Sequence, residues 1–141
     1  MLNIDELSNF LAFDFGTKNI GVAVGQKITK SATALPPLQA QHGIPRWEEI
    51  DSLMENWQPI ALVVGMPHKL DGGDLKVTKL VKKFIEQLKK RYQLPVHTVE
   101  EHLTTKAARA EIFTRGGYKA LQKESVDSVA ARIILEEWMT Y

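Results

Sequence analysis

Cysteine is absent from this 141-residue chain, and long hydrophobic runs are missing too. Without cysteine the chain can form neither disulfides nor thiolate-ligated metal sites. No apolar run approaches the roughly 18 residues that a membrane-spanning helix needs. The first ten residues carry acids early and lack the basic region of a secretory signal. These absences predict a cytoplasmic protein with one domain over residues 1–141, in which residues 1–9 form a flexible extension.

A strong net charge is missing as well, since 18 lysines and arginines against 17 aspartates and glutamates give +1. Bulk charge therefore does not mark the chain as a nucleic-acid binder. The distribution is uneven, because residues 71–92 are rich in lysine and poor in acids. The four histidines show no ligand spacing, which argues against a zinc site.

The hydrophobic pattern predicts strands first and then alternating strands and helices. Predicted strands lie at residues 11–16, 20–25, 29–35, 60–65 and 95–99, and predicted helices at 45–58, 75–92, 105–115 and 126–139. Short connections make the first three strands an antiparallel meander that ends at Pro36-Pro37. The order βββαβαβαα predicts an α/β protein with a five-stranded mixed sheet and helices packed on it. This is the layout of a ribonuclease H-like fold.

Asp14 is a carboxylate inside the apolar run at residues 11–16. Burying an ionised carboxylate without a partner costs several kcal/mol or more, so Asp14 is expected to be paired, protonated or bound to a cation. Glu100 and Glu101 end the last predicted strand, and strand alternation lets only one of them face Asp14. Asp127 lies on the last predicted helix, where alanines at 130 and 131 allow a close approach to the sheet.

Three carboxylates brought together repel one another unless a divalent cation neutralises them. Such hard oxygen ligands suit Mg²⁺ or Mn²⁺. Two such ions about 3.5–4 Å apart stabilise the attacking and leaving oxygens of phosphodiester hydrolysis. The acids therefore predict a metal-dependent nuclease, which needs no serine, cysteine or histidine nucleophile.

Four motifs, in order and with family-like spacing, give the chain a resemblance to a known family. They are Asp14-Phe15-Gly16-Thr17-Lys18-Asn19-Ile20-Gly21-Val22-Ala23, Val64-Gly65-Met66-Pro67 with Asp71-Gly72, Glu100-Glu101-His102-Leu103-Thr104-Thr105, and Lys123 followed by Val126-Asp127 and Ala130-Ala131. From about residue 11 to residue 138 the chain resembles the YqgF-type bacterial proteins, described as Holliday-junction-resolvase-like and as pre-16S rRNA nucleases.

The resemblance implies a ribonuclease H-like fold and a metal-dependent site. By position, the catalytic and metal-binding acids are Asp14, Glu101 and Asp127, so the resemblance chooses Glu101 where the residues alone leave Glu100 open. In the third motif Glu100 replaces the usual aspartate and His102 the usual arginine. An imidazole makes a weaker phosphate or carboxylate contact than the always-charged guanidinium fork.

Motif residues and nearby lysines make up the expected substrate-binding set. Its members are Thr17, Lys18, Lys69, Lys76, Lys79, Lys83, His102, Thr104 and Lys123. The lysines would contact backbone phosphates, a sequence-independent and salt-sensitive contribution. The expected partner is a nucleic acid, with precursor ribosomal RNA favoured over branched DNA, and the expected state is a monomer or weak homodimer.

Two other functions fit part of the pattern. Holliday-junction resolution is the same chemistry on four-way DNA and needs a symmetric dimer. A nucleotide-binding module is the second alternative, because Asp14-x-Gly16-Thr17 also resembles the first phosphate loop of sugar kinases and actin-like proteins. Those proteins close a second related domain over the nucleotide, which 141 residues cannot supply. A binding role without catalysis is the remaining form of this alternative.

Overall fold

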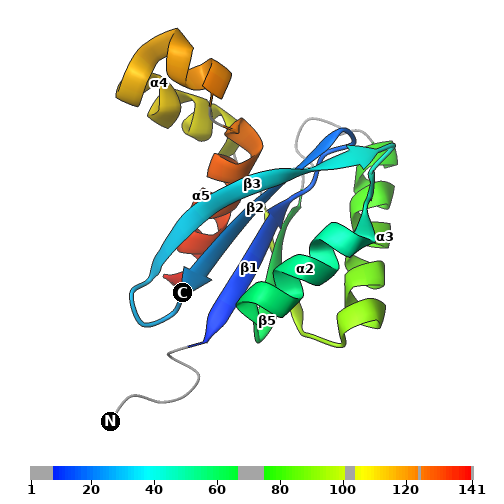
Figure 1. Ribbon diagram of the computed structural model, residues 1–141. Helices are drawn as coiled ribbons and strands as arrows, with labels where there is room; N and C mark the ends of the chain where they lie inside the picture. The colour runs from blue at the N-terminus through cyan, green and yellow to red at the C-terminus, as the bar shows by residue number, and fades with distance from the viewer. Residues whose placement is uncertain (1–7, 67–74, 101–103, 124, 141) are drawn as a thin grey trace.

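The computed structural model contains a six-stranded mixed sheet with the strand order β4-β3-β2-β1-β5-β6 (Figure 1). It describes residues 8–66, 75–100, 104–123 and 125–140. The strands are β1 (Asn9–Asp14), β2 (Asn19–Gln26), β3 (Ser31–Gln41), β4 (Ile44–Pro45), β5 (Ala61–Met66) and β6 (Val96–Glu100). Antiparallel pairing joins β1 to β2 and β2 to β3, whereas β5 pairs in parallel with β1 and β6. The predicted meander is confirmed.

Three parallel strands end at one edge of the sheet, called the carboxyl edge below. Their last residues are Asp14, Met66 and Glu100, and the register pairs Asp14 with Gly65. Loops and ligands gather at such an edge in α/β sheets. The first residues of the first and third sequence motifs, Asp14 and Glu100, therefore lie at the edge where a site is expected.

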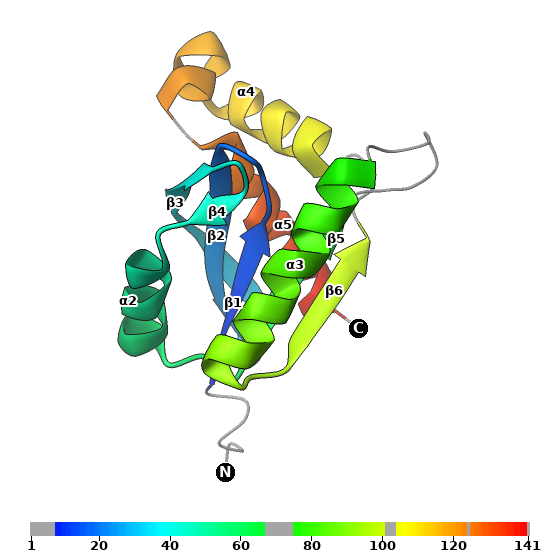
Figure 2. The same ribbon diagram turned by 90° about the vertical axis from the view of Figure 1, so that its right-hand side faces the viewer.

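Helices cover both faces of the sheet (Figures 1 and 2). They are α2 (Trp47–Trp57), α3 (Leu75–Tyr92), α4 (Thr104–Lys123) and α5 (Val126–Met139). On one face, called the α3 face, residues of α2 and α3 join Leu11 and Phe13 in the larger hydrophobic cluster. On the other, called the α5 face, residues of α5 pack on Phe10 and Ala12. A third, smaller cluster joins α4 to the outer side of α5.

The sheet has one strand more than predicted, and β3 is longer than predicted. Instead of ending at Pro36-Pro37, β3 continues to Gln41. Val22 of β2 pairs with Leu35 and Ile20 pairs with Leu38, so the two prolines occupy an irregularity in the β2–β3 register. Proline lacks an N–H for the ladder but is tolerated at such a bulge. The extra strand β4 contains Pro45, which was expected to begin a helix; α2 begins at Trp47 instead.

The C-terminal helices follow the prediction, except that α4 does not end at residue 115 but continues beyond the break to Lys123. The helical backbone of α4 is interrupted at Gly116-Gly117, the predicted break, where Gly117 has φ +63° and ψ −148°. A residue with a side chain rarely adopts that backbone conformation, which explains the glycine. The bounds predicted for α5 are those observed. No helix in the described part of the chain is long and apolar enough to cross a membrane.

An ion pair on the α3 face ties α2 to α3, and it provides a pH-dependent test of the packing. Arg91 Nη2 lies 2.9 Å from Asp51 Oδ2, and the Tyr92 hydroxyl donates a 2.7 Å hydrogen bond to Asp51 Oδ1. The hydrogen bonds from Arg91 and then Tyr92 lower the pKa of Asp51 below its ordinary value of 3.8. A lowered folded-state pKa means that this contribution is present above the unfolded pKa and is lost as the pH falls through the folded one.

We therefore expect Asp51→Asn to lower the Tm at pH 7, because the charge-assisted bonds to Arg91 are lost. In strong acid, where Asp51 of the wild type is also uncharged, the Tm difference should vanish. Thermal unfolding followed by circular dichroism between pH 2 and pH 7 measures both limits. A Tm difference that stayed constant over this range would show that the charge of Asp51 contributes nothing.

Candidate active site

Asp14 lies at the carboxyl edge with its side chain on the α5 face. Side chains alternate along β1, so Asp14 shares its face with Phe10 and Ala12. Only 6% of Asp14 is exposed. The expected burial of this carboxylate is confirmed, and any group that compensates its charge must approach from the α5 side or from the edge.

Gly21 brings α5 to Asp14. It is the antiparallel partner of Asp14 on β2. A Cβ atom added at Gly21 would lie 2.0 Å from the carbonyl oxygen of Asp127 and 2.6 Å from the amide nitrogen of Ser128. Only glycine allows this approach of helix backbone to strand backbone. The two acids Asp14 and Asp127 therefore lie on either side of the same glycine, on one face of the sheet.

Two hydroxyls fix the first turn of α5. Ser125 is the N-cap, and its Oγ accepts a 3.1 Å hydrogen bond from the Ser128 amide. Buried Ser128 in turn accepts a 3.1 Å hydrogen bond at its Oγ from the amide of Val22, beside the register irregularity of β2 and β3. Asp127, in this first turn, is also favoured by the positive end of the helix dipole.

The turn after Asp14 is held by backbone hydrogen bonds. The Thr17 carbonyl accepts a bond of 2.9 Å from the Gly43 amide, and the Lys18 carbonyl accepts one of 2.8 Å from the Ala40 amide. Both residues of the turn have exposed side chains. Thr17 and Lys18, expected to bind substrate, are thus presented to solvent at the carboxyl edge on a fixed backbone.

Glu100 is on the wrong face to join Asp14. Val96 packs in the cluster of the α3 face, whereas the His97 ring contacts Trp138 of α5 and Val99 packs on the α5 face. Alternation along β6 turns Glu100 toward the α3 face. Three predicted site residues, Glu101, His102 and Lys69, lie outside the described residues, as do the side chains of Thr104 and Lys123.

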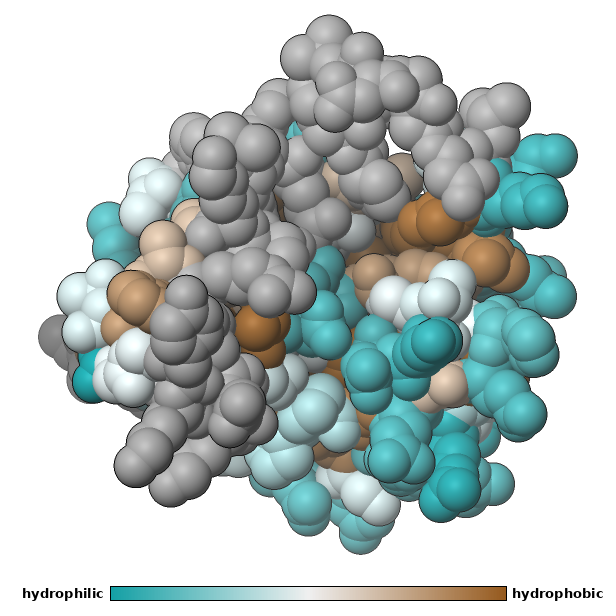
Figure 3. Space-filling model, turned by 90° about the horizontal axis from the view of Figure 1, so that it is seen from above, coloured by the Kyte–Doolittle hydropathy of each residue, from teal (hydrophilic) through white to brown (hydrophobic). Residues whose placement is uncertain are grey.

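The lysines of α3 are not on the face of Asp14. Lys76, Lys79 and Lys83 are exposed on a helix that covers the α3 face. The first turn of α3 is near the carboxyl edge in Figure 2, and Lys83 is roughly 12 Å further along the axis than Leu75 at 1.5 Å per residue. Lys76 is therefore the α3 lysine nearest to the edge. Figure 3 shows the molecule from above, looking down on this edge. Hydrophobic residues (brown) form separate patches there among hydrophilic residues (teal).

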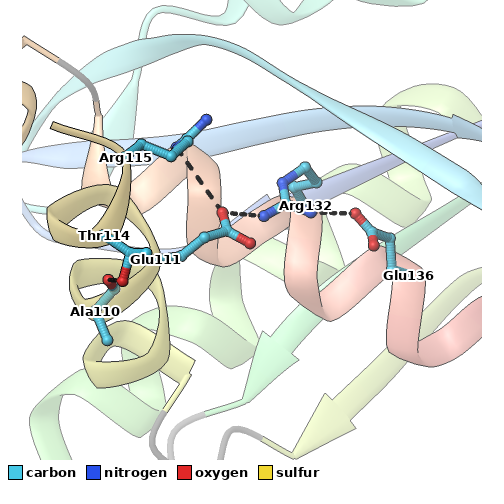
Figure 4. Close-up of polar contacts among 6 residues, drawn as sticks. All are labelled: Ala110, Glu111, Thr114, Arg115, Arg132 and Glu136. Atoms are coloured by element: carbon cyan, nitrogen blue, oxygen red, sulfur yellow. Dashed lines mark hydrogen bonds and ion pairs between the residues drawn. The ribbon is translucent and has the colours of Figure 1, made fainter.

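An arginine holds α4 against α5 (Figure 4). The side chain of Arg132 is only 21% exposed, and its guanidinium forms ion pairs with Glu111 of α4 and Glu136 of α5. Burial alone would lower the pKa of Arg132, but the hydrogen bonds with the two carboxylates raise it. This contact, with Ala108 and Ile112 beneath it, fixes the start of α4 over the first turns of α5.

Arg132→Met is expected to reduce the free energy of unfolding by about 1–3 kcal/mol, because Glu111 and Glu136 lose charged hydrogen bonds. Urea unfolding measures this loss. The matched control is Arg115→Met: its Nη2 lies 3.8 Å from Glu111 Oε2 and its side chain is 51% exposed, so its loss should cost less than about 1 kcal/mol. Equal losses for the two variants would refute the role given to Arg132.

The donor set at the carboxyl edge suits a hard divalent cation. Asp14 and Asp127 offer carboxylate oxygens from two elements whose backbones are in contact, and such oxygens are the ligands that Mg²⁺ and Mn²⁺ prefer. Within the described residues no group of three or more histidine, aspartate or glutamate side chains could hold a metal. The third predicted ligand, Glu101, is outside them.

Comparison with known proteins identifies the family. The family model described as RuvX, Holliday junction resolvase, matches residues 8–141. The chain belongs to this family. Its RuvX relatives include a protein of Actinobacillus pleuropneumoniae serotype 5b, 54% identical over 91% of this chain and 93% of its own, and one of Haemophilus ducreyi, 49% identical over 93% and 95%. Both are named "Putative pre-16S rRNA nuclease". The chain is thus a nuclease, a hydrolase of phosphodiester bonds.

Solved structures confirm the ribonuclease H-like fold of this RuvX protein. Thermus thermophilus RuvC in complex with a Holliday junction substrate superposes with a TM-score of 0.55 over 93% of both chains, at 12% identity. The Holliday junction resolvase of fowlpox virus gives 0.51 over 94% of this chain and 97% of its own, at 15% identity. At such identities the likeness shows a shared fold.

The hydrophobic pattern did not single out Gly21 or Ser128. A glycine inside a predicted strand signals a bulge or a close backbone approach, so Gly21 could have been found. Ser128 looks in sequence like any polar residue in the first turn of a helix. Its buried hydrogen bond to Val22, 106 positions away, is visible only in three dimensions.

Proposed function

We propose that this nuclease uses Mg²⁺ or Mn²⁺, held by Asp14, Asp127 and Glu101, to process the 5′ end of precursor 16S rRNA. The observation that carries the metal site is the placement of Asp14 and Asp127 around Gly21 on one face of the sheet. The choice of substrate is supported by the names of relatives that share about half of their residues with this chain.

Each acid has a defined task in this proposal. Asp14, which is buried at the end of a strand, would coordinate the cation from one side. Asp127, in a capped helix turn, would coordinate it from the other. When bound, the cation activates a water molecule and neutralises the charge that develops on the phosphate oxygens. Holding both carboxylates on regular elements limits their movement, which is what a preorganised site requires.

The place of Glu101 in the chain supports it as the third ligand. Its neighbour Glu100, the other acid of the pair, faces away from Asp14 and is therefore the less suited of the two to share a site with it. The segment is also short: Glu100 ends β6 and Thr104 begins α4, which packs on α5 through Ala108 and Ile112. The end of the segment at Thr104 therefore belongs to a helix that packs on the first turns of α5, which carry Asp127.

Basic side chains around the carboxyl edge would hold the backbone of the nucleic acid. Lys18 and Lys76 are the described lysines best placed for this, with Thr17 as a hydroxyl donor next to Lys18. Lys69, Lys123, His102 and Thr104 complete the proposed contacts, and Lys79 and Lys83 would serve only a substrate that reaches round to the α3 face. Because each phosphate contact releases counterions, binding should weaken steeply with salt.

Cleavage of two substrates side by side tests the function. The wild-type protein is incubated with Mg²⁺ and either a precursor 16S rRNA fragment spanning the 5′ processing site or a four-way DNA junction. We expect cleavage of the RNA near the mature 5′ end and little cleavage of the junction. Symmetric cutting of the junction by a dimer, with the RNA left intact, would instead favour the resolvase activity that the family description names.

A further inference from the structure

A groove of about 710 Å³ opens beside the first turn of α5, on the side of β3. One wall is apolar, with Ala34, Pro36 and Pro37 of β3, and the other is formed by Ser125 and Asp127 of α5. Asn19, the first residue of β2, also lines the groove. The volume is in the range of small-molecule sites, which are about 300–1,000 Å³.

The lining of the groove suits a base and a sugar better than a phosphate. Among the described residues that line it there is no lysine, arginine or histidine, and the one charged side chain among them is that of Asp127, the proposed metal ligand. The rings of Pro36 and Pro37 are exposed flat apolar surfaces against which a base can gain dispersion contacts. In the described part of the chain the Asn19 side chain makes no hydrogen bond, so its amide can both donate to and accept from a ligand.

The groove is continuous with the proposed metal site. Asp127 lines the groove and also contacts Gly21, the strand partner of Asp14. A nucleic-acid strand whose scissile phosphate lies at Asp14 and Asp127 must continue to one side of them. On the β3 side, the groove is the space that its neighbouring nucleotide would enter.

We propose that this groove is a nucleotide subsite, which binds the base and sugar of the nucleotide next to the scissile phosphate in a single-stranded part of the substrate. The inference rests on the proposed nuclease function for the choice of ligand. Single-stranded segments leave their bases unstacked and available to such a site. The Asn19 amide and the Ser125 hydroxyl supply the polar contacts, and the prolines supply the apolar floor.

Heteronuclear NMR on ¹⁵N-labelled Asp14→Asn protein tests the subsite without cleavage. The probe is a ten-nucleotide single-stranded RNA, titrated without divalent metal. We expect shifts of the Asn19 side-chain amide and of the Ala34 and Val126 backbone amides. Shifts confined to other parts of the protein would overturn the proposal. Uridine monophosphate is a second arm, and binding of it to the groove as tightly as the RNA would identify a free-nucleotide site instead.

Filling the groove provides the mutational test. Ala34→Met, added to the same background, should weaken RNA binding about tenfold, whereas Thr33→Met, on the exposed neighbouring residue of β3 that does not line this groove, should leave it unchanged. Asn19→Ala is the second variant in case Ala34→Met does not fold. Unchanged affinity in the folded variants would overturn the subsite. Groove shifts without cleavage of precursor RNA by the wild type would reject the proposed function alone.

Discussion

Replacing Asp14 with asparagine is expected to lower the rate of metal-dependent cleavage by about 10³-fold or more, equivalent to several kcal/mol of transition-state stabilisation. The neutral amide keeps the size of the side chain but loses the charge that attracts the cation. Single-turnover cleavage of precursor rRNA at saturating Mg²⁺ measures the loss. At a free Mg²⁺ concentration about 100 times its Kd, wild-type protein should also gain about 2.7 kcal/mol of stability, and the variant much less.

Asp51→Asn is the matched control, because it makes the same chemical change on α2, within the α3-face packing and away from Gly21. It should lower the Tm but leave both cleavage and stabilisation by Mg²⁺ intact. Full activity of Asp14→Asn, measured beside it, would show that the buried carboxylate has a structural task and that catalysis occurs elsewhere.

Gly21→Ala should have the second-largest effect. The added Cβ would lie 2.0 Å from the backbone oxygen of Asp127, so the first turn of α5 must move away from β2. We expect a loss of about 1–3 kcal/mol in the free energy of unfolding from overpacking. A displacement of Asp127 by about 1 Å should also reduce kcat about 10²-fold. Urea unfolding and cleavage over a range of Mg²⁺ concentrations separate the two effects, and the Mg²⁺ concentration for half-maximal rate should rise.

Gly25→Ala is the control for this substitution. Gly25 lies on the same strand and the same face, but its added Cβ would meet the ends of the Leu135 and Met139 side chains at 3.0 Å and the Ser31 carbonyl oxygen at 2.9 Å. Leu135 and Met139 are at the far end of α5 from Asp127. Gly25→Ala should therefore cost stability while leaving kcat near the wild-type value. If both variants lost activity in proportion to stability, Gly21 would have no positioning role.

The acids on regular elements were predictable because their neighbours are so apolar. Asp14 interrupts a run whose residues are apolar on both faces of the strand, and Asp127 lies in the first turn of a helix whose bounds follow from its pattern. The sequence alone could not decide between the adjacent acids Glu100 and Glu101. That choice depends on which face of the sheet each side chain is on, and the residues that pack against each face are known only from the structure. The contacts of Val96 and Val99 remove Glu100, which the residue pattern alone could not do.

Other features depended on tertiary structure. Pro36-Pro37 is typical of a strand end because neither residue donates to a ladder, yet the irregular register with β2 lets β3 continue. The lysines of α3 suggested a phosphate-binding surface, but which face of the sheet a helix covers depends on packing. At the far end of that helix, Arg91 pairs with Asp51 and lies over the ring of Trp47, so its charge is engaged within the protein.

The most direct test of the central claim, that Asp14 and Asp127 together hold the catalytic cation, is calorimetric titration with Mn²⁺ and Mg²⁺. Wild-type protein, Asp14→Asn, Asp127→Asn and the double variant are compared at constant pH and ionic strength. We expect each single variant to bind at least about tenfold more weakly and the double variant to lose less than the sum of the two losses, because both ligands serve one site. Wild-type affinity in either single variant would contradict this shared site.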